Sequence, residues 1–205
     1  MGYYDPHPLA QLPRPLAIAG MCGAPVEQVA YGLASRTGIG YVSTDRAVEH
    51  ELGLDVATAT VTWGPAKIRA LERRIVDRAL RRRPPPVIAL GESALLDPEL
   101  RAAIAGGATL VVLDADVDEL ARRVAELRRG DAGRFLHVLP PSDGELGPAR
   151  LDALLRARLG ALLEARAPAY AAADLRLAIA GRHHHTLTTE LLDRLDLAPL
   201  ASPTT

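Results

Sequence analysis

The chain has little that would point to disulfides, membranes or nucleic acid. Cys22 is its single cysteine, which excludes an internal disulfide and a cysteine-based zinc site. The formal net charge is -1, so no overall field attracts nucleic acid or an anionic membrane. No apolar run approaches the roughly 20 residues of a membrane span, and the start lacks a signal-peptide pattern. A cytoplasmic location is therefore expected.

Aromatic residues and lysine are also scarce. Aromatics make up 3% of the 205 residues, so the core must be built from aliphatic side chains. Apolar residues make up 48% and charged residues 24%, which is the composition of an ordinary globular domain. Lys67 is the single lysine among 24 basic residues, which leaves arginine as the cation almost everywhere. We expect one domain over residues 1–205, with a flexible tail at 198–205.

Short apolar runs alternate with longer segments of helical spacing, the pattern of a parallel sheet covered by helices on both faces. This predicts an α/β fold with five parallel strands. Residues 44–63 are expected to hold short helices, and residues 129–147, rich in Gly, Pro and Asp, form a lid-like loop. The predicted strands are 16–19, 40–42, 87–90, 109–113 and 175–179, and the predicted longer helices are 26–35, 66–82, 98–105, 117–128, 149–165 and 188–195.

The loop after the first predicted strand lies where a phosphate-binding loop belongs, but its residues do not fit one. Such a loop needs glycines, so that N–H groups converge on phosphate oxygens, a lysine for the outer phosphates and a Ser or Thr for magnesium. Gly20 and Gly23 are present, whereas Val26 stands at the lysine position and Glu27 at the hydroxyl position. Pro25 has no N–H to donate. The Glu27 carboxylate suits a helix start and would repel a triphosphate, so ATP is not expected to bind.

Six short sequence words lie in a fixed order along the chain. They are Gly20-Met-Cys-Gly-Ala, Tyr41-Val-Ser-Thr-Asp45, Ile68-Arg69-Ala-Leu-Glu72, Val87-Ile-Ala-Leu-Gly91, Leu113-Asp-Ala-Asp116 and Arg166-Ala-Pro-Ala-Tyr170. In this order and spacing they resemble the shikimate kinase family over nearly the whole chain. The resemblance implies the P-loop kinase fold of that family, with three α/β/α layers. It also implies that residues 44–63 are a substrate-binding insert.

The resemblance assigns roles to residues after the second predicted strand. In the family this segment carries one aspartate for magnesium and a second that binds and deprotonates the attacking substrate hydroxyl. Ser43 stands at the first position and Asp45 at the second. The resemblance therefore implies that the base is kept and that the magnesium aspartate is lost.

A carboxylate grip is implied by two arginines. The resemblance matches Arg69 and Arg166 to the guanidinium groups that hold the substrate carboxylate, and Glu72 to the acid that supports them. Arg69 and Glu72 are three residues apart and share a helix face, and a planar guanidinium binds a carboxylate through paired hydrogen bonds. The alternatives are a surface ion pair for Arg69 and a charge at a helix end, before Pro168, for Arg166.

Two further segments are assigned by the resemblance. The three-glycine segment that lies against the substrate ring in the family matches Gly91-Glu92-Ser93, so Glu92 would point a carboxylate towards that ring. Arg134 matches the lid arginine, with Phe135 in place of the proline that follows it. Both Gly91 and Arg134 are therefore expected near the substrate.

Three adjacent histidines, His183, His184 and His185, come before the last predicted helix, in a segment that lies near adenine in the family. A metal site and a solvated loop are the two interpretations. Neighbours in sequence point in different directions, and no acidic or cysteine ligand is close in sequence. The loop is favoured, and neither a metal nor a cofactor is expected.

The substitutions gather on the phosphoryl-donor side, whereas the acceptor side keeps its guanidinium groups and its base. Since phosphoryl transfer depends on charge neutralisation by magnesium and cations, the sequence favours loss of that activity. We expect a non-kinase enzyme, a lyase, dehydratase or isomerase, that binds a shikimate- or chorismate-like cyclic carboxylic acid. Asp45 would be the base and Glu92 its partner, with Glu27 in the same cleft. The alternatives are an inactive pseudokinase that senses a ligand or binds a protein partner, homodimers included, and an unconventional shikimate kinase.

Overall fold

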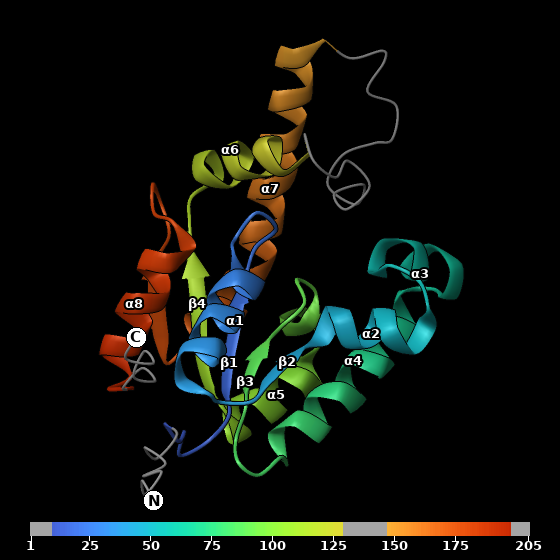
Figure 1. Cartoon of the computed structure of the whole chain (residues 1–205). Coiled ribbons are helices and arrows are strands. Elements are labelled where there is room, and N and C mark those ends of the chain that lie inside the picture. The colour runs from blue at the N-terminus through green and yellow to red at the C-terminus, as the bar shows by residue number, and fades with distance from the viewer. Residues whose placement is uncertain (1–9, 129–146, 198–205) are drawn as a thin grey trace, which may run out of the picture.

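A computed structural model of the chain describes residues 10–128 and 147–197, which form three layers (Figure 1). The middle layer is a five-stranded sheet in the order β2-β3-β1-β4-β5, and every neighbouring pair of strands is parallel. The predicted α/β fold with five parallel strands is confirmed. The strands are β1 (Leu16–Gly20), β2 (Tyr41–Ser43), β3 (Val87–Ala89), β4 (Thr109–Asp114) and β5 (Leu175–Ala178).

Helices cover both faces of the sheet. The segment 44–63 holds two short helices, as expected, and the second of them, α3, lies beyond the β2 edge (Figure 1). The helices are α1 (Val26–Thr37), α2 (Thr44–Leu52), α3 (Val56–Trp63), α4 (Pro65–Leu80), α5 (Pro98–Gly107), α6 (Val117–Arg128), α7 (Pro148–Ala171) and α8 (His184–Arg194), with a short 3-10 turn, η1 (Ala94–Leu96).

The central strand β1 divides the core in two, because successive side chains of a strand point to opposite faces. Leu16 and Ile18 pack with apolar residues of α1 and α8, whereas Ala17 and Ala19 pack with those of α4, α5, α6 and α7. All four side chains are buried, as a parallel sheet covered on both faces requires. A third, smaller cluster joins α2, α3 and α4 through Val48, Ala59, Ile68, Leu71 and Ile75.

Helix α7 does not end where the sequence predicts. It continues through Pro168 to Ala171, so Arg166 lies inside the helix and not at its end. Proline lacks an N–H group and normally interrupts a helix. Ala169 and Tyr170 follow it and are buried in the core, and this packing outweighs the missing hydrogen bond.

Some expectations fall on residues that the structure does not describe. The lid-like segment, with Arg134, lies outside the described residues apart from Gly147, which precedes the first turn of α7. The expected tail at 198–205 also lies outside them. Among the helices of residues 10–128 and 147–197, none is both long enough and apolar enough to cross a membrane.

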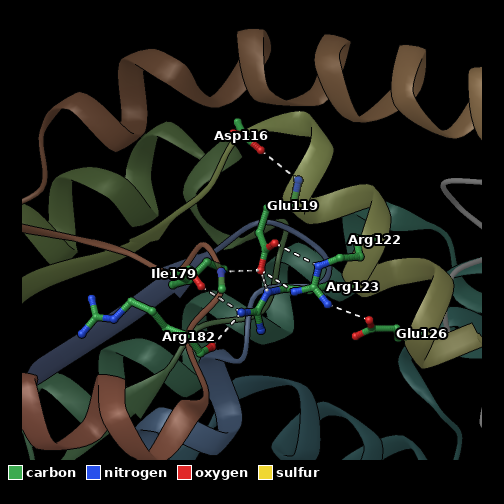
Figure 2. A network of polar contacts seen from close by, with 8 residues as sticks. Asp116, Glu119, Arg122, Arg123, Glu126, Ile179 and Arg182 are labelled. Atoms are coloured by element: carbon green, nitrogen blue, oxygen red, sulfur yellow. Dashed lines mark hydrogen bonds and ion pairs between the residues drawn. The ribbon is translucent and has the colours of Figure 1, made fainter.

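A polar network fixes the start of α6 to the turn between β5 and α8 (Figure 2). The Glu119 carboxylate accepts hydrogen bonds from Arg122 Nη2 at 2.7 Å and from Arg123 Nε at 2.6 Å. Arg123 Nη2 donates to the carbonyl oxygens of Ile179 at 2.9 Å and Arg182 at 2.8 Å. These contacts, the hydrogen bonds from Arg122 above all, lower the pKa of Glu119 to about 2. One carboxylate thereby holds the arginine that joins two elements far apart in sequence.

Replacing Glu119 by Gln should lower the free energy of unfolding at pH 7 by about 1–3 kcal/mol, because charge-assisted hydrogen bonds are lost. The lowered pKa means that the carboxylate stabilises the fold fully above about pH 4.5 and loses this effect as the pH falls towards 2. The difference between wild type and Glu119→Gln should shrink over that window in urea titrations. Glu126→Gln, at an exposed partner of Arg122, is the control and should cost less than about 0.5 kcal/mol. Equal losses for the two variants would contradict this account.

Candidate functional site

The carboxyl ends of β2 and β3 meet at one edge of the sheet, where ligands bind in open parallel sheets. Thr44 begins α2 directly after β2, and Gly91 follows the end of β3. The Gly91 N–H donates a buried hydrogen bond of 2.6 Å to the Thr44 hydroxyl oxygen. This bond fixes the distance between the two strand ends and the side chains that follow them.

Gly91 cannot carry a side chain in this arrangement. A Cβ atom at this position would overlap a carboxylate oxygen of Asp45 and would lie 3.0 Å from Glu72 Oε1. Asp45 comes from the first turn of α2 and Glu72 from α4, so two helices bring carboxylates to the same point on the backbone. Glu72 is 2% exposed, and burial, followed by the Asp45 charge, raises its pKa to about 7. One member of the pair is therefore only partly ionised near pH 7.

Arg69 and Ser93 both act on the Glu72 carboxyl. The Ser93 hydroxyl donates a long hydrogen bond of 3.4 Å to Glu72 Oε2. Arg69 lies on the exposed side of α4, and its charge lowers the pKa of Glu72, against the larger effect of burial. Arg69, Glu72 and Gly91, which the sequence assigned to one substrate site, thus lie in one place in the structure.

Arg166 forms an ion pair with Glu92, the residue that follows Gly91. Its side chain is 4% exposed, and Nη2 donates to Glu92 Oε1 at 3.0 Å. The buried Arg166 Nε has no hydrogen-bond partner. Burial raises the pKa of the Cys22 thiol, and the Glu92 charge raises it further, whereas Arg166 lowers it. Burial likewise raises the pKa of Tyr170. A guanidinium expected to hold a ligand carboxylate therefore already holds one from the chain itself.

The loop after β1 is closed on itself. The Ala24 N–H donates to the Met21 carbonyl and the Val26 N–H to the Ala24 carbonyl, both at 2.9 Å. Pro25 has no N–H, so three successive backbone positions offer no hydrogen bond to a phosphate in this conformation. Val26, the first residue of α1, is 9% exposed and packs in the core, where a lysine would normally reach outwards. A Cβ atom on Gly20 would lie 2.8 Å from Ala24 Cβ, so this position needs glycine.

The Glu27 carboxylate, in the first turn of α1, accepts hydrogen bonds from a neutral hydroxyl and from a charged guanidinium. Its Oε1 accepts a hydrogen bond of 2.6 Å from the Ser43 hydroxyl, at the end of β2. Its Oε2 accepts from Arg46 Nε and Nη2, both at 3.4 Å. The Glu27 side chain is 22% exposed and that of Arg46 is 70% exposed. The loop and the start of α2 are therefore joined by a carboxylate.

The remaining residues that the sequence singled out lie elsewhere. Lys67 Nζ stands 3.6 Å from the centre of the Trp63 ring, a cation–π contact on neighbouring helices. The solvated loop expected around the three histidines is wrong, because α8 already begins at His184. His183 precedes this helix and its Nδ1 accepts from the His185 N–H at 3.4 Å. This early helix start turns the three rings towards one another.

Comparison with known proteins assigns the family. The family model for shikimate kinase matches residues 27–196. The chain belongs to the shikimate kinase family. The shikimate kinase of Thermobifida fusca is 38% identical over 147 residues, which are 71% of this chain and 78% of that protein. The shikimate kinase of Novosphingobium aromaticivorans is 28% identical over 186 residues, 89% of this chain and 88% of that protein.

Solved structures of shikimate kinases share the fold. The shikimate kinase from Acinetobacter baumannii in complex with shikimate has a TM-score of 0.73 at 19% sequence identity, over 89% of this chain and 92% of that chain. The shikimate kinase from Bacteroides thetaiotaomicron has a TM-score of 0.71, also at 19% identity, over 90% and 99%. The P-loop kinase fold implied by the sequence words is therefore confirmed.

The prediction of a non-kinase lyase or isomerase is wrong, and so is the expectation that the chain is not an ATP-dependent kinase. Relatives up to 38% identical are shikimate kinases, and the family model covers most of the chain. The contacts explain part of the error. Glu92 is held by Arg166 and Glu27 by Ser43, so two carboxylates read as catalytic have structural partners.

The substitutions at positions 27 and 43 are reciprocal. The shikimate kinase pattern has a hydroxyl on the loop and an aspartate on the second strand, whereas this chain has Glu27 on the loop and Ser43 on the strand. The Ser43 hydroxyl lies 2.6 Å from the Glu27 carboxylate. The two positions together therefore still place one carboxylate next to one hydroxyl. In the sequence these positions look like two separate losses, because the contact between them is formed only in the folded chain.

The raised pKa of Glu72 predicts that the free energy of unfolding depends on pH. The unfolded chain ionises this carboxyl near pH 4.5 and the folded chain near 7, so the stability of the wild type falls as the pH rises between them. Glu72→Gln has no such cost. Its free energy of unfolding relative to wild type should therefore rise by about 3 kcal/mol from pH 4.5 to 8 in urea titrations. Glu51→Gln, at an exposed partner of Arg74, should show no such trend. A pH-independent difference for Glu72→Gln would contradict the assignment.

Proposed function

We propose that this chain binds a shikimate-like hydroxy acid and phosphorylates it with ATP, as an unconventional shikimate kinase. The observation that carries the proposal is the close approach of Asp45 and Glu72 to Gly91. It supports an acceptor site in which two carboxyl groups lie together and the pKa of Glu72 is raised to about 7. The names of the relatives support the same reaction.

Asp45 is the residue that would meet the substrate hydroxyl. The hydroxyl oxygen would form a bond to the γ-phosphorus of ATP while the bond from that phosphorus to the bridging oxygen breaks and ADP leaves. The hydroxyl proton would pass to the Asp45 carboxylate. Phosphoryl transfer relies mainly on positioning and charge stabilisation, so holding this carboxylate in place is the chief contribution of the acceptor side.

A divalent cation fits the donor side. Magnesium prefers oxygen ligands and is commonly held by one or two carboxylates together with substrate phosphates. Glu27 and Ser43 supply a carboxylate and a hydroxyl 2.6 Å apart, and these would hold it. When bound, the ion would neutralise charge on the phosphates. The exposed Arg46 guanidinium, which contacts Glu27, would supply the positive charge that lysine gives in other phosphate-binding loops.

The ligand carboxylate would take the place of the Glu92 carboxylate on Arg166. Arg166 is paired with Glu92, so an incoming carboxylate must displace that side chain before it can take the guanidinium. The buried Arg166 Nε, which has no hydrogen-bond partner, offers a further donor once the ligand is present. Arg69 lies exposed beside Glu72 and would complete the grip.

A ligand-sensing protein without turnover is the second candidate. The observation that favours it is the closed loop, in which the Ala24 and Val26 N–H groups donate to the loop's own carbonyl oxygens. With Pro25 between them, this conformation leaves few backbone donors for phosphates. The same acceptor site would then serve binding alone.

Turnover separates the two candidates. The purified chain should release ADP from ATP and magnesium when shikimate is present, with the phosphorylated acid detected by mass spectrometry. Asp45→Asn should lower kcat at least about 100-fold, because the base is removed. Asp77→Asn, at an exposed partner of Arg81, should leave kcat unchanged. Saturable shikimate binding with no ADP release would assign the second candidate, and absence of both binding and release would overturn the proposal.

The internal ion pair predicts an unusual gain of affinity. Glu92→Gly should bind shikimate about 10-fold more tightly than wild type, a change of about 1.4 kcal/mol, because no internal carboxylate competes for Arg166. Glu92→Gln should give part of this gain. Glu99→Gln, at an exposed carboxylate on α5, is the matched control. Isothermal titration calorimetry measures all four proteins, and unchanged or weaker binding by Glu92→Gly would show that Glu92 does not compete.

A further inference from the structure

Three imidazole rings gather at the start of α8, on residues to which the proposed function assigns no role. The ring centroids of His183 and His184 are 4.0 Å apart, and those of His184 and His185 are 4.3 Å apart. One ring nitrogen from each of the three residues lies within 4.8 Å of the others. The extended backbone of His183, with φ -80° and ψ 150°, meets the first helical turn here, and this change of direction brings neighbouring side chains together.

The backbone that carries these rings is held on both sides. Arg123, from α6, donates to the carbonyl oxygen of Arg182, the residue before the cluster (Figure 2). The Gly181 N–H donates to Glu119 at 3.3 Å, and the Arg182 side chain pairs with Glu190 of α8. The histidines therefore stand on a segment fixed to two helices, as a preorganised ligand set requires.

We propose that His183, His184 and His185 form a binding site for a divalent transition-metal ion such as Zn²⁺. Imidazole nitrogen suits zinc, copper and nickel, and three such ligands leave a coordination position open for water or another donor. This chemistry differs from the oxygen ligands that magnesium needs. The positive charge of the neighbouring Arg182 is balanced by its ion pair with Glu190, which weakens its repulsion of the metal ion.

Small side-chain movements complete the site. Two nitrogen ligands on a tetrahedral zinc ion lie about 3.4 Å apart, so the ring nitrogens must come closer than the 4.8 Å that now encloses them. His183 and His185 are exposed and can rotate, whereas His184 is half-buried and gives the fixed point. Closure would displace one weak hydrogen bond, the 3.4 Å contact from the His185 N–H to His183 Nδ1.

Zinc titration of the untagged full-length chain tests the proposal, in competition with a chromophoric chelator. The wild type should bind one ion per chain at least about 100-fold more tightly than a variant with all three histidines replaced by alanine. Zinc at about 100 times its Kd should raise the Tm of the wild type by about 5 °C. Cobalt should give the visible absorption of a four-coordinate site. His184→Gln is the second variant, should the triple replacement fail to fold, and should lose at least about 10-fold in affinity.

Two controls isolate the cluster. His50→Ala removes an exposed histidine of α2, and Cys22→Ala removes the single thiol, and both should bind zinc as the wild type does. Equal zinc affinity in the wild type and the triple variant would overturn the proposal. One ion shared by two chains would overturn it as well, since the three histidines of one chain would then be insufficient. The measurement does not depend on shikimate phosphorylation.

Discussion

The buried hydrogen bond between the Gly91 N–H and the Thr44 hydroxyl holds the end of β3 against the start of α2, and the acceptor side is arranged around it. With this distance fixed, Asp45 and Glu72 approach a backbone atom that has no room for a side chain. Burial, and then the nearby Asp45 charge, make the ionised form of Glu72 costly, so the pKa of this carboxyl rises to about 7. The fold thereby sets the protonation of the site before any ligand arrives.

Ion pairs within the chain neutralise one arginine near Gly91 and one near the loop after β1. Arg166 is paired with Glu92, and Arg46 is paired with Glu27, so each guanidinium already has a carboxylate from the same chain. If the proposed function is right, an anionic ligand would reach Arg166 by an exchange of partners. Such exchange lowers affinity for anions in general and favours ligands whose other groups make good contacts, which is one way that specificity arises.

The sequence predicted the sheet well, because β1 and β4 are apolar runs buried on both faces, and six short words sufficed for the family. It could not predict contacts between distant positions. Glu27 and Ser43 look like two separate losses in the sequence, and this favoured the wrong prediction of a non-kinase enzyme over a kinase. The course of α7 past Pro168 and the gathering of rings at His184 depend on tertiary packing and on one change of backbone direction, which residue types alone do not reveal.

Val26 links the departure from the common phosphate loop to the packing of the core. Its side chain, at the start of α1, packs in the core, and a Cβ atom on Gly20 would lie 3.0 Å from it. A lysine there would either bury an ammonium group or leave a void where valine packs, and both lower stability. A lysine introduced at position 26 alone would therefore disturb the packing of its neighbours, and a loop of the common kind would also need replacement of Pro25 and Glu27.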